Sequence, residues 1–428
     1  MERHRRITPH LSLAVLIASL LLVLQMVAPA PPLTYVLAVL AGALALSYYW
    51  ARQMATKVTL ERERRYGWAQ VGDVLEERFT LHNRSWLPVV WAEIRDHSTL
   101  PGYTASRVTG TDGQSYTHWT VEGECRQRGT FALGPVDVHL ADPLGLFHVS
   151  LRLGEQSSFV VYPVIAALPP LDMPRGSATG RVRASLRAAE ATPSVSSVRL
   201  YTPGDAPHRI HWRTTARRGE LYVKDHDREP AGDLWIILDL HQAVHAGAGE
   251  RSTLEYGVTL AASLADAMLR QNRAVGLLCD GGEYLLLRPQ WGQAQLWRIL
   301  RSLSTVRAQG RRRLGHLIAQ AAPVLARGLT AILITPSTDP EWLGGLLDLQ
   351  QRGVAAGVIL LDPASFGGQG NIEAMVGLLY DRAVAVRVID QGFRFRPLVP
   401  PRKQRPTFKV LSTGRVIAVP PERGNWGN

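Results

Sequence analysis

Two long uncharged stretches lie near the beginning of the chain. No charged residue occurs from residue 11 to 28 or from 33 to 50, and only residues 29–32 separate the stretches. About 20 helical residues cross the roughly 30 Å of hydrocarbon in a bilayer, so each stretch is near the lower length limit for a span. The pattern predicts a transmembrane hairpin within residues 1–55, with spans at about 11–28 and 33–50.

The residues that flank these stretches indicate their orientation. The second stretch ends in aromatic residues, which prefer the membrane interface: Tyr48, Tyr49 and Trp50. Basic residues precede the first stretch and follow the second: Arg3, Arg5 and Arg6, then Arg52, Lys57, Arg62, Arg64 and Arg65. By the positive-inside rule we expect a two-span protein of the cell membrane with both termini in the cytoplasm.

Two other interpretations of the apolar stretches remain open. A secretory signal peptide could be cut near Ala28-Pro29-Ala30, and two buried core helices could have the same composition. The length of the stretches, the proline after the cleavage site and the basic flanks favour the membrane hairpin. Because the cytoplasm is reducing, we expect Cys125 and Cys279 to be free and inert.

Alternating apolar and polar residues follow the hairpin. Segments such as 78–82 and 136–140 alternate with a period of two, and turn residues separate them. This pattern predicts an antiparallel β-sandwich over residues 56–165. Its tryptophans fit packing better than a sugar or base platform: Trp68, Trp86, Trp91 and Trp119.

From residue 233 onward, continuous apolar runs alternate with segments of helical period. Four runs have the composition of strands that are buried on both faces: 234–238, 274–278, 331–334 and 357–361. Residues 385–389 are predicted to be a further strand. We predict a mostly parallel sheet with helices on both faces over residues 233–391. Residues 166–232 are predicted to be a linker that includes the segment 199–224, and residues 392–428 a basic, proline-rich tail.

The positive charge is concentrated at the two ends of the chain. The net charge is +12; residues 1–65 contain eight Lys/Arg and three Glu (+5), and residues 391–428 contain eight Lys/Arg and one Glu (+7). The middle of the chain is therefore neutral, whereas a nucleic-acid-binding domain is normally basic itself. We expect a membrane surface as partner rather than nucleic acid, for which binding through the basic tail is the alternative.

The segment 199–224 has the strongest local signal. Pro203-Gly204 predicts a turn, Asp205 can cap a helix that begins near residue 206, and Gly219 can end that helix. The rest of the segment, up to Lys224, alternates like a strand.

Three arginines of the predicted helix, Arg209, Arg213 and Arg217, are four residues apart and would lie on one face. They could dock an acidic partner or a phosphate through bidentate contacts, or form a solvated face. The alternative is a structural role, in which these arginines form ion pairs with nearby carboxylates: Asp225, Asp227 and Glu229.

The motifs of this segment resemble the signature of the bacterial family called "domain of unknown function 58". The residues that carry the resemblance are Arg199, Tyr201, Pro203, Gly204, Asp205, Arg209, Trp212, Arg213, Arg217 and Lys224. The resemblance implies a membrane-anchored protein with a domain similar to von Willebrand factor type A. It also implies partners, a MoxR-type AAA+ ATPase and a transglutaminase-like membrane protein, and a role for the signature in an interaction surface or domain joint.

Domains similar to von Willebrand factor type A can bind a divalent metal through Asp-x-Ser-x-Ser and a later threonine and aspartate. The corresponding residues here are Asp239, His241, Ala243 and Thr335, with Pro336 at the later aspartate position. Both serines are missing, so we expect a degenerate site without metal and a protein-binding surface at this sheet edge. Three histidines could be considered as zinc ligands: His208, His211 and His226. No further ligand follows them at the spacing of a zinc site, so we do not expect one.

Other catalytic signals are weak. The chain has no Walker lysine loop, no Gly-x-Gly-x-x-Gly after a strand and no Gly-x-Ser-x-Gly. A transglutaminase-like thiol at Cys279 is less plausible than a structural cysteine, and we expect no cofactor. The sequence therefore favours a non-enzymatic, membrane-anchored adaptor that works with a MoxR-type ATPase in envelope or complex assembly. The alternative is a hydrolase of envelope precursors that uses the signature segment, with Asp205, His208 or His211 in a cleft.

Overall fold

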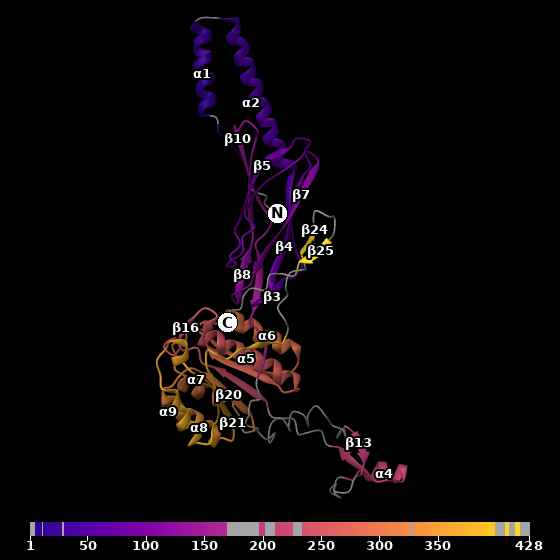
Figure 1. Cartoon of the computed structure of the whole chain (residues 1–428), viewed down its shortest axis with the longest axis vertical. Helices are drawn as coiled ribbons and strands as arrows, with labels where there is room; N and C mark the ends of the chain where they lie inside the picture. Colours follow the sequence, from indigo (N-terminus) through magenta and orange to yellow (C-terminus); the bar gives the residue numbers. More distant parts are fainter. Residues whose placement is uncertain are drawn as a thin grey trace. The chain divides into compact units, whose positions relative to one another are not determined.

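The computed structural model describes residues 5–10, 12–27, 30–168, 197–201, 210–225, 233–325, 328–398, 407–410 and 416–419. The chain divides into two compact units (Figure 1): Met1–Tyr162 with Pro401–Asn428, and Pro163–Pro400. The first unit contains a helical hairpin and mostly antiparallel sheets. The second contains an α/β fold and the signature segment.

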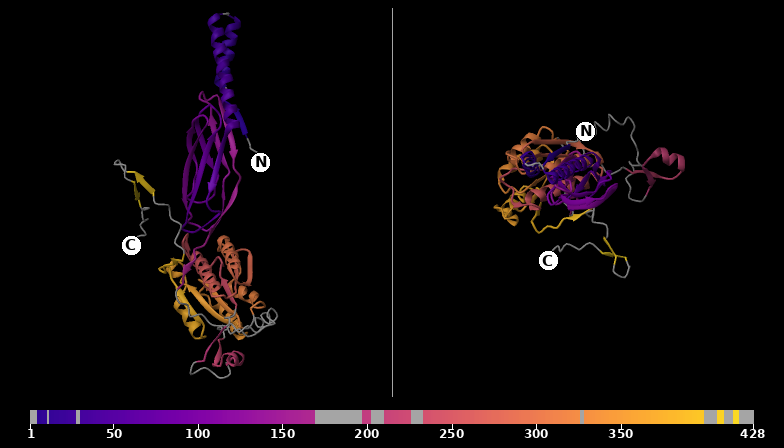
Figure 2. Two further views of the ribbon diagram at one scale, coloured as in Figure 1. Left: turned by 90° about the vertical axis from the view of Figure 1, so that its right-hand side faces the viewer. Right: turned by 90° about the horizontal axis from the view of Figure 1, so that it is seen from above.

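Two helices project from the sheets of the first unit (Figure 2). Helix α1 (Ser12–Val27) contacts helix α2 (Pro31–Lys57), and at the tip of the hairpin Gln25 Nε2 donates to Thr34 Oγ1 at 3.1 Å. Among the helices in the described part of the chain, α2 alone is long and apolar enough to cross a membrane; the apolar part of α1, Val15–Val27, is shorter.

Helix α2 continues beyond the predicted end of the second span. It runs to Lys57 rather than Trp50, and Ala51, Met54 and Ala55 in its last turns are fully or almost fully buried. Met54 and Ala55 follow Ala51 by three and four positions, so the three residues lie on one apolar face. The charged Arg52, within this stretch, and Lys57, after it, obscured the face in the sequence.

The sheets of the first unit consist of short alternating strands. They pair antiparallel as predicted, except that β3 pairs parallel with β11. A five-stranded sheet has the order β1-β10-β9-β5-β6, and two three-stranded sheets have the orders β2-β4-β7 and β3-β11-β8. The bounds are β1 (Arg5–Pro9), β2 (Val58–Arg64), β3 (Trp68–Gln70), β4 (Val74–Asn83), β5 (Val89–Asp96), β6 (Arg107–Thr111), β7 (Ser115–Glu124), β8 (Gly129–Leu133), β9 (Val136–Ala141), β10 (Phe147–Leu153) and β11 (Ser157–Tyr162).

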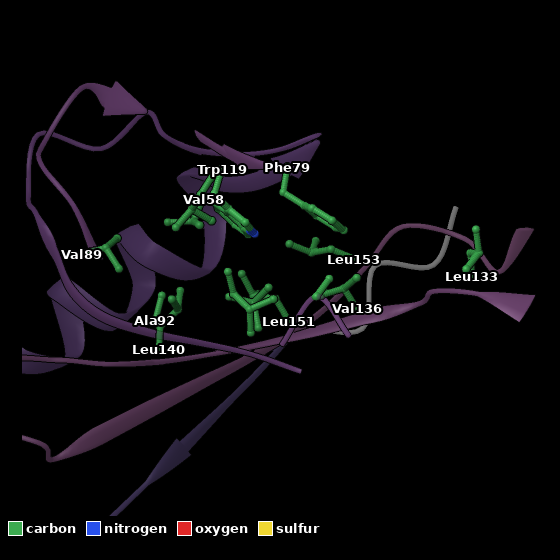
Figure 3. Packing of buried hydrophobic residues seen from close by; sticks show 14 of the residues in the cluster. Val58, Phe79, Val89, Ala92, Trp119, Leu133, Val136, Leu140, Leu151 and Leu153 are labelled. Atoms are coloured by element: carbon green, nitrogen blue, oxygen red, sulfur yellow. The ribbon is translucent and has the colours of Figure 1, made fainter. Parts of the chain in front are cut away.

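The sheets share one hydrophobic core, to which the last turns of α2 also contribute (Figure 3). Alternate residues of β9 and β10 are buried, as a period of two requires. Phe79 stacks on Trp119 with ring centroids 5.5 Å apart. Of the four predicted packing tryptophans, Trp119 is buried and Trp68 partly buried, whereas Trp86 and Trp91 are exposed.

Strand β1 is a part of this unit that the sequence did not predict. Its five residues, Arg-Arg-Ile-Thr-Pro, pair antiparallel with β10 in the register Ile7↔Val149, and the strand ends two residues before α1 begins. Its two arginines were interpreted only as a basic flank of the first span.

The second unit has the predicted mostly parallel sheet. Its order is β19-β18-β15-β20-β21-β22, and β19 pairs antiparallel at one edge. The strands are β15 (Leu234–Leu238), β18 (Val275–Asp280), β19 (Tyr284–Gln290), β20 (Thr330–Thr335), β21 (Ala355–Leu361) and β22 (Ala385–Ile389). Every residue of β15, β18 and β20 is buried, which explains their continuous apolar sequences.

Helices cover both faces of this sheet. Trp235 and Ile237 of β15 pack with α7, α8 and α9, whereas Leu238 lies against Gly257 of α5, which in turn contacts α6. The bounds are α5 (Thr253–Arg270), α6 (Gln293–Thr305), α7 (Leu314–Ala321), α8 (Leu343–Gln351) and α9 (Ile372–Tyr380), with single turns η2 (Pro340–Trp342) and η3 (Ala364–Phe366).

Several short strands complete the described residues. They pair as β12 (Ala166–Ala167) with β23 (Arg396–Pro397), β16 (Gly247–Ala248) with β17 (Arg251–Ser252), and β24 (Thr407–Val410) with β25 (Val416–Val419). The last pair lies in the segment predicted as a tail.

Candidate functional site

The signature segment forms a small module of two strands and one helix. Strand β13 (Ser197–Leu200) pairs with β14 (Tyr222–Asp225), and helix α4 (Trp212–Arg218) connects to β14. Two hydrogen bonds hold the module together: His211 N donates to the Tyr222 carbonyl oxygen at 2.7 Å, and Tyr222 N donates to the side-chain Oγ1 of Thr215 at 3.0 Å.

The start of the signature helix differs from the prediction. The helix begins at Trp212 instead of near residue 206, because Ile210 forms a β-bridge and His211 is the N-cap. The Nδ1 atom of His211 accepts a hydrogen bond from Thr214 N at 3.2 Å, so an imidazole has the capping role that was assigned to Asp205. The helix ends as predicted at Gly219, whose φ of 73° is the left-handed conformation that glycine favours.

The predicted arginine stripe is only partly in the described chain. Arg213 and Arg217 lie four residues apart on α4 and are exposed, as is Trp212 at 67%. Within the described residues, neither of these two arginines has a carboxylate partner. Arg218 is different: its guanidinium lies over the Tyr222 ring, 5.5 Å from the centroid.

The other signature residues fall into two groups. Arg199 lies on β13 opposite Val223, and Lys224 lies on β14 opposite Val198. After β13, Tyr201 N donates to the Leu221 carbonyl oxygen at 2.8 Å. The remaining predictions lie outside the described residues: Pro203, Gly204, Asp205, Arg209 and the pairing candidates Asp227 and Glu229.

A second candidate site lies where the parallel strands end. Asp239 follows β15 and is 2% exposed; its Oδ2 accepts from Thr335 Oγ1 at 2.7 Å and its Oδ1 from His241 N at 3.0 Å. Neither arginine nor lysine pairs with this carboxylate in the described chain. Burial raises the pKa of Asp239 above its ordinary value of 3.8 and outweighs the opposing effects of Thr335 and His241. The residues assigned from the metal-site resemblance thus do come together, because parallel strands end at one edge.

His245 supports the same corner. Its Nε2 lies 3.0 Å from the carbonyl oxygen of Asp239 and its Nδ1 3.0 Å from Thr253 Oγ1. Since a carbonyl only accepts, Nε2 carries the proton in the neutral ring. Burial lowers the pKa of His245 from 6.5 to about 4, so the ring is neutral at pH 7.

Few oxygen atoms around Asp239 are free to coordinate a cation. A cavity of about 140 Å³ adjoins Asp239, His241 and Ala243, and Ser337, Asp339 and Glu341 also line it. Both carboxylate oxygens of Asp239 already accept hydrogen bonds, and Arg313 pairs with Asp339 at 3.7 Å and with Glu341. In the described ranges, no three His, Cys, Asp or Glu residues are grouped to hold a metal ion.

A run of three arginines beside this corner was missed in the sequence. Arg311, Arg312 and Arg313 are exposed and follow Gly310, whose amide donates to Leu240 O at 3.0 Å. A Cβ at Gly310 would lie 2.1 Å from the Asp280 carbonyl oxygen, so the close approach requires glycine.

Two of these arginines line a second cavity of about 510 Å³, together with Gln242, Asp280, Gly282 and Gln309. Arg312 lies 3.5 Å from Asp280 Oδ2 and over the Tyr284 ring, while Arg311 has no ion pair in the described part of the chain. In the sequence, three consecutive arginines were the feature that could have indicated this site.

The two cysteines are free, buried thiols, as predicted. Burial raises the pKa of Cys125 to about 11 and that of Cys279 to about 12, so both remain protonated at pH 7. Cys279 is therefore a structural residue of β18 and not an activated nucleophile.

The two units define a chain with an apolar helical hairpin, antiparallel sheets and a mostly parallel α/β sheet whose carboxyl edge is lined by arginine. Residues 197–365 match the family described as "Protein of unknown function DUF58". The resemblance of the signature segment to this family is thereby confirmed, and it extends over most of the α/β sheet.

Curated relatives match the same part of the chain. Uncharacterized protein YeaD of Bacillus subtilis is 25% identical over 177 residues, which are 41% of this chain and 42% of YeaD. Uncharacterized protein Rv1480 of Mycobacterium tuberculosis is 24% identical over 173 residues, which are 39% of this chain and 54% of Rv1480. The match therefore spans about half the length of these relatives.

Among solved structures, the CARDB domain of the PF1109 protein from Pyrococcus furiosus is similar to part of the chain. The match has a TM-score of 0.18 and 12% identity, and it covers 24% of this chain and 86% of that domain. A score this low supports no statement about function.

Proposed function

We propose that the chain is a non-enzymatic adaptor that a two-span helical hairpin anchors to the cell membrane, with both its sheet units in the cytoplasm. In this proposal it presents its signature module and arginine-lined sheet edge to an acidic protein partner. The family resemblance suggests a MoxR-type AAA+ ATPase, acting in envelope or complex assembly, with a transglutaminase-like membrane protein as a further partner.

The attachment of the hairpin supports the anchor. Strand β1 pairs with β10 before α1 begins, and α2 ends inside the core of the same unit. Both ends of the hairpin are therefore fixed to one folded body, so a chain that crosses the membrane in α1 must return in α2. Cleavage of a signal peptide near residue 28 would remove β1 and expose the edge of β10, which argues against that alternative.

The exposed face of α4 is the observation that supports an interaction role. Trp212 is 67% exposed beside Arg213 and Arg217, which have no carboxylate partner in the described residues. Tryptophan and arginine dominate the binding energy of many protein interfaces, and arginine binds carboxylates through two parallel bonds. This face, defined as Trp212, Arg213 and Arg217, is called the α4 face below.

The arginine-lined edge provides a second contact area. Arg311 is exposed and faces the 510 Å³ cavity from a loop that is fixed by Gly310. In our proposal this edge takes the place of the metal-dependent binding surface implied by the resemblance to von Willebrand factor type A domains. Positive charge at the edge suits an acidic partner.

Co-purification from native membranes tests the α4 face. Trp212→Ala combined with Arg213→Glu and Arg217→Glu should lose the partner, whereas the matched surface changes Arg301→Glu and Arg352→Glu should retain it. Both control arginines are exposed. Equal recovery of partners with all variants would remove the docking claim, and turnover of an envelope precursor by the purified chain would favour the hydrolase alternative.

A further inference from the structure

The end of the sheet unit next to the hairpin has features of a membrane-contacting surface. We propose that two loop tips at this end, Trp86 and Leu144, insert into the headgroup region of the bilayer and form an interfacial collar around α2. This inference rests on the proposed membrane anchor and specifies how the body is held against the membrane.

The sheet unit has no spacer between it and the helices. Strand β1 ends at Pro9 and α1 begins at Ser12, while α2 ends at Lys57 and β2 begins at Val58. Trp50 Nε1 donates to Pro88 O at 3.1 Å, which ties α2 to the loop between β4 and β5. The body is therefore held at a fixed depth below the hairpin.

The length of α1 sets that depth. Its 16 residues extend about 24 Å at 1.5 Å per residue, less than the roughly 30 Å thickness of the hydrocarbon. For α1 to cross, the bilayer must thin or its flanking residues must enter the interface. Either response brings the adjoining end of the sheet unit into contact with the headgroups.

The residues at this end are apolar and aromatic where they are most exposed. Trp86, between β4 and β5, is 62% exposed and donates to the Tyr49 hydroxyl at 3.4 Å; Leu144, between β9 and β10, is 59% exposed. The Leu144 turn is near α2 because Tyr48 packs on Phe147, with ring centroids 5.7 Å apart. Both tips thus flank α2 at the level of the aromatic residues that end its apolar stretch, where such side chains prefer the interface.

Buried polar residues hold both loops rigid. Asn83 Nδ2 and Ser85 Oγ donate to Leu87 O at 2.8 and 2.7 Å, and Asn83 and Ser85 are 1% and 2% exposed. Asp142, 4% exposed, accepts from Leu144 N at 3.0 Å. Loops fixed in this way keep large apolar side chains in solvent unless something covers them, and the continuity with the hairpin identifies the bilayer as the covering surface.

The charges around the collar match a membrane with anionic lipids. Arg52, Lys57 and Arg84 are exposed just below the aromatic level, and Arg84 N donates to Lys57 O at 3.1 Å. Asp112, in the turn between β6 and β7, is an exposed carboxylate at this end. Basic residues next to a membrane are attracted to anionic headgroups.

Site-specific fluorescence in lipid nanodiscs tests the collar. Single cysteines replace Trp86, Leu144, Val39 and Gln156 in the full chain and carry an environment-sensitive fluorophore; the native cysteines are buried and protonated. Val39 is an exposed residue of the proposed span, and Gln156 lies in the turn beyond the opposite end of β10.

We expect the fluorescence of the labels at residues 86 and 144 to be blue-shifted and to be quenched by lipids with a nitroxide near the headgroup. The label at 39 should be quenched by nitroxides deep in the acyl chains. The label at 156 should have the emission of the fluorophore in water and should not be quenched. The quenching at 86 and 144 should increase in phosphatidylglycerol discs over phosphatidylcholine discs, and Arg84→Gln with Lys57→Gln should abolish that increase.

If the labels at 86 and 144 match the label at 156 while the label at 39 is deep in the bilayer, the collar is refuted and the anchor stands. If the label at 39 is also in water, the anchor itself is wrong. Equal quenching at 86 and 144 in both lipids would refute the electrostatic part of the collar.

Discussion

The two units bury carboxylates in opposite ways. In the antiparallel unit, Glu77 is 1% exposed and meets a cation, Arg62, whose Nε lies 3.0 Å from Oε2. In the α/β unit, Asp239 is 2% exposed and has hydroxyl and amide donors but no arginine or lysine among its described partners. Glu77 thus belongs to an ion-paired network inside the first unit. Asp239 lies at the carboxyl edge of the parallel sheet, where the stability of the fold depends on whether its carboxyl group is protonated.

The network around Glu77 links three strands and a loop of the first unit. The Tyr103 hydroxyl also donates to Glu77, Arg62 lies 3.5 Å from Asp96, and Ser98 donates to Asp96 Oδ1 at 2.9 Å. Burial and the neighbouring Glu77 carboxylate raise the pKa of Tyr103 far above its ordinary value, so this hydroxyl is a permanent donor. Glu77 is therefore held by both a guanidinium and a phenol, which fixes its carboxylate within the sheets.

The largest effect is expected from breaking this network. Glu77→Ala leaves the Arg62 guanidinium, 19% exposed, without its main partner. Removing one member of a buried ion pair costs about 3–5 kcal/mol of unfolding free energy. Urea unfolding followed through hydrogen exchange of β2 and β4 measures the change.

The matched control for Glu77→Ala is Glu61→Ala, on the neighbouring strand, where the carboxylate is 57% exposed beside His82. An exposed pair of this kind contributes less than about 1 kcal/mol. If both substitutions cost the same, Glu77 has no special role in the first unit.

A smaller effect is expected at His245. Because its pKa is lowered from 6.5 to about 4 in the folded chain, the unfolded chain binds more protons between these values. The unfolding free energy of the α/β unit therefore falls as pH decreases from about 6.5 to about 4, by about 3 kcal/mol. His245→Gln should keep a donor to the Asp239 carbonyl and lose this fall.

Urea midpoints of the α/β unit at pH 7, 6, 5 and 4 measure the His245 contribution. The control His316→Gln removes an exposed histidine of the same unit and leaves the buried ring of His245 in place, so it should keep the fall in stability. A profile in which parent and His245→Gln lose the same stability on acidification would contradict a buried neutral ring.

The smallest effect is expected from Asp239→Asn. Because burial raises the pKa of Asp239 above 3.8, the folded chain retains a proton that the unfolded chain releases, and stability falls as pH rises through the folded pKa. At pH 5 the amide costs about 1 kcal/mol, since it cannot accept from both Thr335 and His241. As pH rises to 8 this cost should shrink or change sign, because the variant has no carboxylate to ionise.

Urea midpoints of parent and Asp239→Asn across this range check the prediction. A difference that stays constant with pH would mean that Asp239 ionises as easily in the fold as in water. It would also mean that the contrast with Glu77 is only geometric.

Much of the fold could be predicted because burial imposes a visible period. The continuous apolar run of β15 and the alternation in β9 and β10 each indicated the correct element. Strand β1 was missed because Arg-Arg-Ile-Thr-Pro is an edge strand whose partner, β10, is more than 130 residues away in sequence. A pairing so distant leaves no local pattern.

The candidate site was predictable only in part for similar reasons. Asp239 and Thr335 could be placed together, because parallel strands end at one edge. The helix of the signature was started too early, since Asp205 and His211 are both capable caps and the β-bridge at Ile210 depends on the fold. The position of Arg311–Arg313 at the sheet edge could not be predicted, because it depends on the contact of Gly310 with the chain just after β15.

The most direct test of the account is the labelling of single cysteines in sealed cells with a membrane-impermeant maleimide. Pro32→Cys, at the hairpin tip and outside the proposed spans, and Gln156→Cys, in the body, are both at exposed positions, and the native thiols are buried. We predict that Pro32→Cys is labelled from outside and that Gln156→Cys is labelled only after the cells are opened. Labelling of Gln156→Cys in intact cells would contradict a body held on the cytoplasmic side by a helical hairpin.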